Sequence, residues 1–345
     1  MNDLTCPTPF VDQHQILLAH GGGGRLMHQL LAQTIFPALG SSWLEQPHDG
    51  VVLQASGQMA FTTDAYVVRP LEFPGGDIGS LAVYGTVNDL AMCGARPRWL
   101  SLNLILEEGL ETALLRRILA SVAASARRCG VEIVTGDTKV VGRGQADGMY
   151  LATTGIGEVM AGQLIGPRQV QLGDALIVSG DLGRHGVAIM ASREGLGFET
   201  ELASDCAPVH EMVLALLEAG IDLHCLRDPT RGGLASALHE IAAVSGLSFW
   251  LEEAALPVHE AVAGACEILG LDPLYVACEG RFLACLPAAQ VDRALTVLKA
   301  HPQGHGAKWL GWVGKPEMAP VLLRGTLGTV RVVDLPSGEQ LPRIC

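Results

Sequence analysis

Stretches of alternating apolar residues and stretches of helical periodicity follow one another along nearly the whole chain. A period of two residues indicates a half-buried strand, and a period of about 3.6 residues indicates an amphipathic helix. In the first half, strands are predicted at 59–67, 98–106, 131–135 and 149–157 and helices at 81–91 and 112–128. The order of these elements is mixed α and β.

The second half of the chain repeats this arrangement. Strands are predicted at 175–179, 248–251, 281–286 and 308–313 and helices at 209–218, 234–244, 258–269 and 288–299. Residues 321–334 read as a closing hairpin with a glycine on each side of its turn. The stretch 164–173, which contains two glycines and a proline, separates the halves and predicts a domain boundary.

The length, charge and cysteine content of the chain exclude several classes of protein. A chain of 345 residues with 49% hydrophobic content can fill two cores. A formal net charge of −13 without a basic stretch argues against binding to nucleic acid or to an anionic membrane. No apolar run approaches the roughly 18 residues of a membrane span, and the acidic first residues do not resemble a signal peptide. Singly scattered cysteines, without a CxxC pair or zinc spacing, predict a reduced cytoplasmic protein.

A run of glycines precedes the first helical pattern. His20 is followed by Gly21, Gly22, Gly23 and Gly24 and then by a helix-like stretch. Consecutive glycines before a helix expose backbone N–H groups that can hold an anion, and the helix dipole favours that anion. No GK[ST] follows, so this is not a Walker motif. A flexible linker is an equal alternative, and His20 is either a phosphate ligand or a structural residue.

Four acidic residues stand among threonines and glycines. Asp64 and Asp137 are predicted at strand ends, Asp228 precedes a helix, and Asp89 with Asn88 lies inside an otherwise apolar helix. An acid inside an apolar helix is costly without a partner. Carboxylate oxygens suit Mg²⁺ that bridges nucleotide phosphates, although each Asp alone is more often a turn or cap residue.

Two cations accompany these acids. Lys139, two residues after Asp137, can neutralise a phosphate or polarise an oxygen, or it can simply be solvated. Arg231 either contacts phosphate or caps a turn.

The chain ends in a turn-prone segment with a cysteine as its last residue. Residues 335–345 contain Pro336, Gly338 and Pro342 and end at Cys345. Extended at about 3.3 Å per residue, they could span about 35 Å. Such a segment could carry a thiol into a pocket of the same chain, of a second copy or of another enzyme. The alternative is an ordinary disordered chain end.

Together these features resemble the HypE family of hydrogenase maturation proteins over nearly the whole chain. The segments that carry the resemblance are His20–Gly24, 61–64, 73–76, 88–89, 105–109, 134–140, 204–206, 227–233, 254–258, 279–280 and 342–345. The aspartate-bearing segments are shared with aminoimidazole ribonucleotide synthetase, selenophosphate synthetase and thiamine-monophosphate kinase, whereas the tail that ends in Cys is peculiar to HypE.

The resemblance implies an α/β (α+β) chain with the two-domain aminoimidazole ribonucleotide synthetase-like (PurM-like) fold. It implies an N-terminal extension at 1–15, an ATP-binding and dimerisation domain at 16–165, a C-terminal α+β domain at 166–334 and a mobile tail at 335–345. The first domain would pair with its copy through a shared β-barrel and form a homodimer. ATP would bind between the domains, near the dimer interface.

The implied reaction is an ATP-dependent dehydration. A HypF-type carbamoyltransferase places a carbamoyl group on the terminal thiol, and the enzyme converts the thiocarboxamide into a thiocyanate. The cyano group then passes to the iron of nickel-iron hydrogenase, held by the HypC and HypD scaffold proteins. The expected cofactors are ATP and Mg²⁺.

The resemblance also assigns roles to residues. The expected catalytic residues are Cys345, Lys139 and Glu279, with Lys139 and Glu279 as candidate bases for the nitrogen protons. The expected nucleotide ligands are His20, Gly21, Gly22, Gly23, Gly24, Asp64, Asn88, Asp89, Asp137, Thr138 and Arg231. The expected metal ligands are Asp64, Asp89, Asp137 and Asp228. This chain departs from the family pattern at Gly22, where serine is common, and at Arg281, where lysine is common.

Two other readings stay open on the sequence. Selenophosphate synthetase shares the expected fold, but it needs a Cys or selenocysteine near the early glycines, and none stands between Val11 and Met92. A carrier without catalysis would use Cys345 to ferry a group or metal, and its acidic residues would be structural. A single thiol makes a poor metal site by itself.

Overall fold

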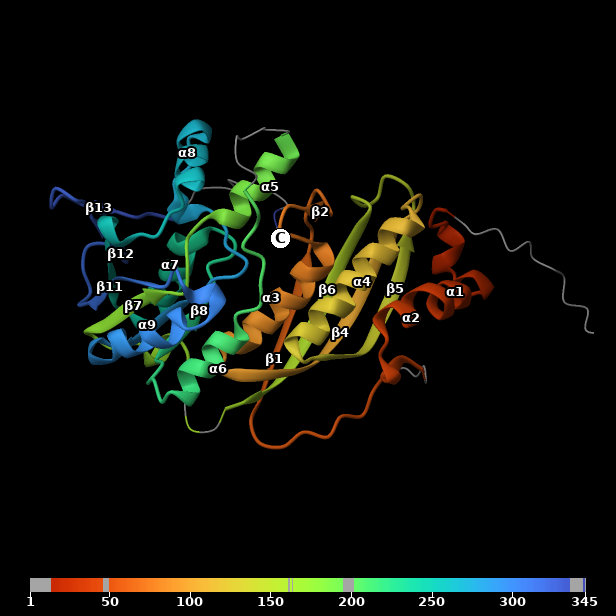
Figure 1. Ribbon diagram of the computed structural model, residues 1–345, viewed down its shortest axis with the longest axis horizontal. Coiled ribbons are helices and arrows are strands. Elements are labelled where there is room, and N and C mark those ends of the chain that lie inside the picture. The colour runs from red at the N-terminus through yellow and green to blue at the C-terminus, as the bar shows by residue number, and fades with distance from the viewer. Residues whose placement is uncertain are drawn as a thin grey trace, which may run out of the picture.

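The computed structural model describes residues 14–45, 50–160, 162, 164–194, 202–335 and 344. Two β-sheets, each covered by helices, lie side by side, and helix α3 (Ile78–Met92) lies between them (Figure 1). The first sheet is built from residues between 59 and 159 and the second from residues between 174 and 332. The predicted boundary after residue 165 falls between the two sheets and stays a prediction.

The first sheet has four strands in the order β1-β6-β4-β5. Their bounds are Met59–Tyr66 for β1, Ala95–Glu107 for β4, Glu132–Val141 for β5 and Met149–Val159 for β6. The β4 and β5 strands are parallel, and the other pairs are antiparallel. Alternate residues such as Leu102 and Leu104 of β4 are buried in a core with α3 and with helix α4 (Thr112–Cys129).

The opposite face of this sheet is open to solvent. Phe61 on β1 is 69% exposed, and Ile105 on β4 is 38% exposed. Between them, alternate residues of β6 such as Thr154 are half-buried. An apolar side chain as exposed as Phe61 in the middle of a strand marks a surface that can be covered by another protein.

The segments around this sheet are short. A hairpin of β2 (Glu72–Phe73) and β3 (Gly76–Asp77) leads into α3, and Asp77 caps that helix by accepting from Gly79 N at 2.7 Å and Ser80 N at 2.9 Å. The N-terminal segment is a 3-10 helix Leu18–Gly21, α1 Arg25–Leu30, a π-helix Leu31–Ile35, α2 Phe36–Leu39 and a 3-10 helix Ser42–Glu45. It packs beside α4 and β5.

The second sheet has seven strands in the order β13-β12-β9-β11-β7-β10-β8. Their bounds are β7 Asp174–Val178, β8 Cys225–Arg227, β9 Ser248–Glu252, β10 Leu283–Pro287, β11 Lys308–Gly314, β12 Val321–Arg324 and β13 Val330–Val332. The helices of this half are α5 Arg184–Glu194, α6 His210–Glu218, α7 Gly233–Ser245, α8 Glu260–Leu269 and α9 Val291–Lys299. One core contains α7, and a second contains α6 and α9.

Helix α3 belongs to the cores of both halves. Ile78 and Leu81 share a core with Val187 of α5 and Val262 of α8, while Met92 shares another with α6. Nearly every residue of α3 is buried as a result. A helix that is apolar all round is expected where packing comes from all sides.

Most of the predicted elements are present, and the structure differs from the prediction in several places. The β5 strand continues to Val141 instead of ending at 135, because it stays paired with β4 as far as Glu107. The α5 helix, β8 and the β2–β3 hairpin were not predicted. Residues 275–277, which precede Glu279 and also have the apolar composition of a strand, form none, and Tyr275 is the last residue of a 3-10 helix at Pro273–Tyr275.

Some predictions fall largely outside the described residues. Residues 1–13 of the predicted extension, residues 336–343 of the predicted tail and Cys345 are not described. Gln15 forms a β-bridge with Glu111, and Ile16 is fully buried. Within the part of the chain that is described, no helix has both the length and the apolarity to cross a membrane.

Candidate functional site

An acidic cluster lies where the two halves meet. Asp64 comes from β1, Asp89 from α3, Asp228 from the turn before α7, and Glu279 from the segment before β10. The Thr62 hydroxyl donates to Asp89 Oδ2 at 2.8 Å, which orients that carboxylate. These four acids, predicted separately from distant segments, influence one another electrostatically.

Burial and mutual repulsion disfavour the ionised forms of these acids. Burial, followed by the charge of Asp228, raises the pKa of Asp89 to about 7. Burial also raises the pKa of Asp228. The pKa of Glu279 is raised well above its usual value, first by burial and then by the charges of Asp228, Asp205 and Asp64. Nearby positive charge does not fully offset this repulsion, so the cluster favours a ligand that brings a cation.

Cations touch this cluster only at its margin. Arg231, whose role was open on the sequence, lies 3.9 Å from Asp64 Oδ1, and its side chain is mostly exposed. Arg227 lies 3.9 Å from Asp228 Oδ1 and also pairs with Glu240. Arg231 can therefore reach a phosphate beside Asp64 without leaving its turn.

In and beside the acidic cluster, two buried carboxylate oxygens lack a hydrogen-bond partner among the described residues: Glu279 Oε1 and Asp205 Oδ2. The other Asp205 oxygen accepts from Glu279 N at 3.2 Å, so the two residues are held together. Arg281 Nε lies 3.8 Å from Asp205 Oδ2, beyond hydrogen-bond distance. An unsatisfied buried oxygen is costly, and acceptors in this state suit a ligand that brings N–H donors.

Sequence reasoning missed Asp205. Its segment was recognised within the family resemblance, but no chemistry was assigned to its carboxylate. The available signal was an acid between two small residues, Ser204 and Cys206, in a stretch without helical or strand periodicity.

Asn88 connects the two halves. Its Oδ1 accepts from Val209 N at 2.8 Å, and its Nδ2 donates to the backbone oxygens of Ala207 at 3.1 Å and Glu279 at 3.4 Å. Among the described residues, these three hydrogen bonds of the amide are with backbone atoms of the second half. Asn88 fixes the backbone that carries Glu279, and its predicted contact with the nucleotide stays a prediction.

A second polar group lies at the far edge of the first sheet. Lys139 Nζ is 3.1 Å from Asp137 Oδ2, and both side chains are more than half exposed. They share the open face of the sheet, because β5 continues through both residues and they are two positions apart. The pair is therefore available to a ligand or to a second copy of the chain.

The predicted glycine segment approaches this group. A Cβ at Gly21 would lie 2.9 Å from Val140 Cβ, so glycine allows the segment to pack tightly on β5. His20 is buried, and its Nδ1 accepts from Leu17 N at 2.9 Å, which is a structural contact. Gly23 has a φ of +70°, and Gly24 precedes the six-residue helix α1. Phosphate binding by His20 and by Gly21–Gly24 stays a prediction.

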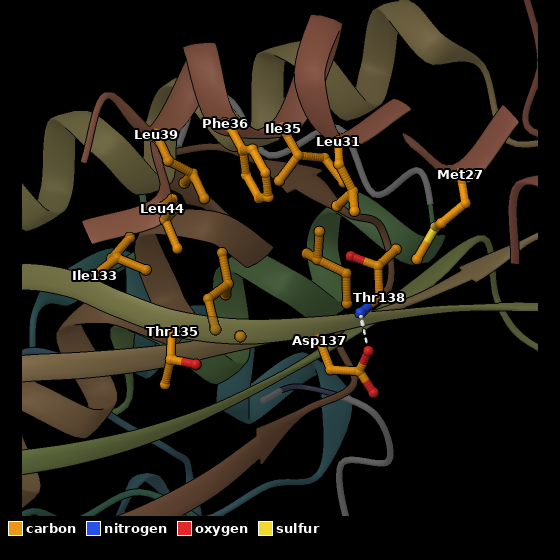
Figure 2. A pocket seen from close by; sticks show the side chains of 13 residues that line it. Met27, Leu31, Ile35, Phe36, Leu39, Leu44, Ile133, Thr135, Asp137 and Thr138 are labelled. Carbon is orange, nitrogen blue, oxygen red and sulfur yellow. Dashed lines mark hydrogen bonds between the residues drawn. The ribbon is translucent and has the colours of Figure 1, made fainter. Parts of the chain in front are cut away.

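Thr138 points the other way from its neighbours. Its side chain is buried on the helix-covered face and lines a cavity of ≈ 170 Å³, whereas its backbone N donates to Asp137 Oδ1 at 2.8 Å (Figure 2). The cavity is otherwise lined mainly by apolar side chains, among them Leu31 and Phe36. The Thr138 hydroxyl therefore does not face the space in front of Asp137, and its nucleotide contact stays a prediction.

One chain does not bring the four predicted metal ligands together. Asp64 and Asp137 lie on opposite edge strands and on opposite faces of the sheet. Three strand spacings separate those edges, a distance of about 14 Å. Among the described residues, no three His, Cys, Asp or Glu side chains form a group that could hold a metal ion.

The acidic cluster nevertheless fits Mg²⁺ that arrives with a nucleotide. Mg²⁺ is commonly held by one or two carboxylates together with substrate phosphates and water, rather than by a cage of protein ligands. Asp64, Asp89 and Asp228 offer such carboxylates. Their like charges repel one another, which favours the binding of a cation. Asp137 does not belong to this set within the same chain.

The raised pKa of Asp89 predicts how the stability of the folded chain depends on pH. Its pKa is about 7 in the folded chain against 3.8 in the reference state, so folding favours the protonated form. This contribution is complete below pH 3.8 and is lost as pH rises towards 7. We expect Asp89→Asn to raise the thermal midpoint of the ligand-free protein by a few degrees at pH 8 and by about a third as much at pH 5.

Thermal unfolding followed by circular dichroism at both pH values measures this difference. Asp292→Asn, at a position in the first turn of α9 outside the cluster, is the control and should show no comparable pH-dependent gain. An Asp89→Asn variant that is equally stabilised or destabilised at both pH values would contradict the argument.

Comparisons with known proteins agree with this architecture. Residues 47–159 match the family described as AIR synthase related protein, N-terminal domain, and residues 171–319 match the corresponding C-terminal domain. A carbamoyl dehydratase HypE of Azotobacter vinelandii is 50% identical over 329 residues, which are 95% of this chain and 96% of the relative.

Solved structures give the same result. A crystal structure of hydrogenase maturation protein HypE in complex with ATP matches with a TM-score of 0.91 and 44% identity over 95% of this chain and 99% of that one. A HypE–HypF complex contains a chain that matches with a TM-score of 0.79 and 39% identity over 91% of this chain and 100% of that one. The chain therefore belongs to the HypE family of hydrogenase maturation proteins and has the two-domain fold of the AIR synthase related proteins.

Proposed function

We propose that this chain is a carbamoyl dehydratase that converts a thiocarboxamide on Cys345 into a thiocyanate, using ATP. The product supplies cyanide ligands for the iron of nickel-iron hydrogenase. The observation that carries the proposal is the pair of unpartnered buried oxygens, Glu279 Oε1 and Asp205 Oδ2, beside an acidic cluster suited to Mg²⁺ and phosphates. A carboxamide nitrogen brings the two N–H donors that such a pair lacks.

The reaction must remove the carbonyl oxygen and both nitrogen-bound protons from the carboxamide. Bound Mg-ATP supplies the phosphoryl group that turns the carboxamide oxygen into a leaving group. The balanced change is RS–CO–NH₂ plus ATP to RS–C≡N plus ADP and phosphate, in which the oxygen departs with the phosphate. Asp64, Asp89 and Asp228 hold the cation and the phosphates, and Arg231 reaches the phosphates from the margin.

Glu279 is the proposed base for the nitrogen protons, and its environment sets when it can act. Burial and the charges of Asp228, Asp205 and Asp64 raise its pKa, which favours the protonated form in the ligand-free chain. A cation held by Asp228 and Asp64 would offset part of these charges and would favour the ionised form. Base strength is thus coupled to occupancy of the phosphate site.

A second copy of the chain completes the site in this proposal. Asp137 and Lys139 lie on the open face of the first sheet, away from Asp64 and Glu279. The exposed Phe61 and Ile105 on that face support pairing of two sheets into a shared barrel. A two-fold dimer can then place Lys139 of one copy near the acidic cluster of the other, where it neutralises phosphate.

The proposed partners are those that membership of the HypE family implies. A HypF-type carbamoyltransferase loads Cys345, and the HypC and HypD scaffold proteins hold the iron that receives the cyano group. The similarity of this chain to HypE in its solved complex with HypF supports the first of these partners. A cytoplasmic location fits the seven described cysteines, all of which are free thiols.

Intact mass spectrometry tests the proposed function directly. The full-length protein is incubated with its carbamoyltransferase, carbamoyl phosphate and ATP. We expect a carbamoyl increment, followed by loss of one water when Mg²⁺ is present. Cys345→Ala should show neither change, and Cys93→Ala, which removes an exposed cysteine instead, should show both.

The same measurement tests the alternative that the chain is a carrier without catalysis. A carrier would keep the carbamoyl increment unchanged in the presence of Mg-ATP. That result, with the carbamoyltransferase shown to be active, would overturn the proposed dehydration.

A further inference from the structure

The backbone oxygen of Ile344, in the peptide bond that links it to Cys345, is bound inside the protein. It accepts a hydrogen bond from Nε2 of His185, a fully buried residue in the first turn of α5. The Ile344 side chain is only 5% exposed and belongs to the core shared by the two halves. Other parts of the chain thus bind both the backbone oxygen and the side chain of Ile344, and together they form its receiving site.

The hydrogen bonds around His185 fix its tautomer. Nδ1 lies 2.8 Å from the Ser204 hydroxyl, and that hydroxyl accepts from Cys206 N at 3.0 Å. A neutral ring with its proton on Nε2 satisfies every one of these groups, because Ser204 then donates to Nδ1 and Nε2 donates to Ile344. Burial lowers the pKa of His185 and so favours the neutral ring.

The ring is also held by its neighbours from both halves of the chain. Phe73 of β2 packs edge-on against His185 with ring centroids 5.6 Å apart. Ser204 N donates to Pro74 O at 2.8 Å, which ties the His185 partner to the same hairpin. Helix α5 and β2 are neighbours in Figure 1. His185 therefore has little freedom to turn away from Ile344.

The receiving site lies beside the unpartnered acids. Asp205 immediately follows Ser204, and its charge acts on His185. Asp205 in turn accepts from Glu279 N, and its second oxygen has no hydrogen-bond partner among the described residues. The peptide bond next to Cys345 is therefore anchored at a point from which one further residue can extend towards those oxygens.

We propose that His185, oriented by Ser204, is a positioning residue that docks the Ile344 backbone oxygen and thereby holds Cys345 beside Asp205 and Glu279. This inference rests on the proposed function for its chemical purpose, but the docking itself can be measured without turnover. A hydrogen bond to a backbone oxygen does not depend on which residue carries that oxygen. Specificity for this segment therefore comes from the apolar site that holds the Ile344 side chain.

The docking is tested by the reactivity of Cys345 in the full-length protein. Iodoacetamide labelling is followed by peptide-resolved mass spectrometry, which separates Cys345 from the exposed Cys93. We expect His185→Ala to label Cys345 about tenfold faster than the unmodified sequence, since a buried acceptor loses its donor. His185→Gln, which keeps an N–H donor, should restore part of the protection.

A matched histidine provides the control. His239 Nε2 binds the backbone oxygen of Val333 at 2.7 Å, a contact of the same kind made by a half-buried residue of α7. His239→Ala should leave Cys345 labelling within about twofold of the unmodified rate. Ile344→Asp changes the docked segment itself and should accelerate labelling as His185→Ala does, with no substitution in α5.

A turnover measurement then separates docking from chemistry. His185→Ala should accept the carbamoyl group at an undiminished rate but lose about tenfold in its conversion to the cyano form, with the KM for ATP unchanged. Equal Cys345 labelling in His185→Ala, His239→Ala and the unmodified chain would overturn the inference. Faster labelling in His185→Ala, with no conversion in the unmodified chain, would support docking and reject the proposed function.

Discussion

Replacing Glu279 with Gln is expected to lower the rate of conversion of the carbamoyl to the cyano group by about 10²–10⁴-fold, the usual loss on removing a general base. Glutamine keeps the size of the side chain but cannot take a proton from nitrogen. Because Glu279 is fully buried and Asn88 holds its backbone oxygen, the substitution should leave its position unchanged. Single-turnover mass spectrometry of pre-carbamoylated protein gives the rate without contribution from loading.

The control for this substitution is Glu211→Gln, at an exposed acid that pairs with His301 at 3.3 Å on the surface. It should convert at the unmodified rate. Thermal unfolding should also show that Glu279→Gln is at least as stable as the unmodified chain at neutral pH, because a raised pKa means that the charged form is unfavourable there. Conversion within a fewfold of the unmodified rate would remove Glu279 from the role of base.

Mixing two inactive variants is expected to restore activity, because the proposed site draws on two copies of the chain. Asp137→Ala disables the group on the open face of the sheet, and Asp228→Asn disables the acidic cluster. Random pairing makes half of the dimers mixed, and each mixed dimer has one intact site of two, so activity recovers to about a quarter of normal. Conversion rates are measured after the two variants have exchanged subunits.

The matching control mixes Asp64→Ala with Asp228→Asn, two changes within the same cluster. No mixed dimer then contains an intact site, and activity should stay at the level of the separate variants. Recovery in this control, or no recovery in the first mixture when exchange is shown by mass spectrometry, would contradict a site shared between copies.

The sequence predicted well those elements that bury either one face or all of their side chains over many residues. The α4 helix runs from Thr112 to Cys129 against a prediction of 112–128, because its apolar stripe faces a single core, the one it shares with α3 and the first sheet. The β5 strand was predicted too short because Gly136 and Asp137 resemble a turn. A Cβ at Gly136 would lie 2.0 Å from Leu102 O, so this glycine marks close strand packing and not a turn.

The candidate site was predicted as a set of residues but not as an arrangement. Spacing along the chain identified Asp64, Asp89 and Asp228, yet it could not show that Asp137 lies on the other face of the sheet. The face of a side chain depends on strand register, which is set by pairing with distant strands. Likewise, His185 stands in a helix without an apolar stripe, and only the fold brings it to Ile344.

The place of α3 in both cores has a consequence for how the chain folds. Its residues complete the packing of the first sheet and, through Met92, that of α6 in the second half. Asn88 adds hydrogen bonds to the backbone that follows Cys206. Two of the cores contain residues of both halves, although the core around α7 is built from the second half alone. Because cooperative units are defined by shared packing, the loss of either half removes packing from the other. We therefore expect a single heat-absorption peak on unfolding, although the chain reads as two domains in sequence.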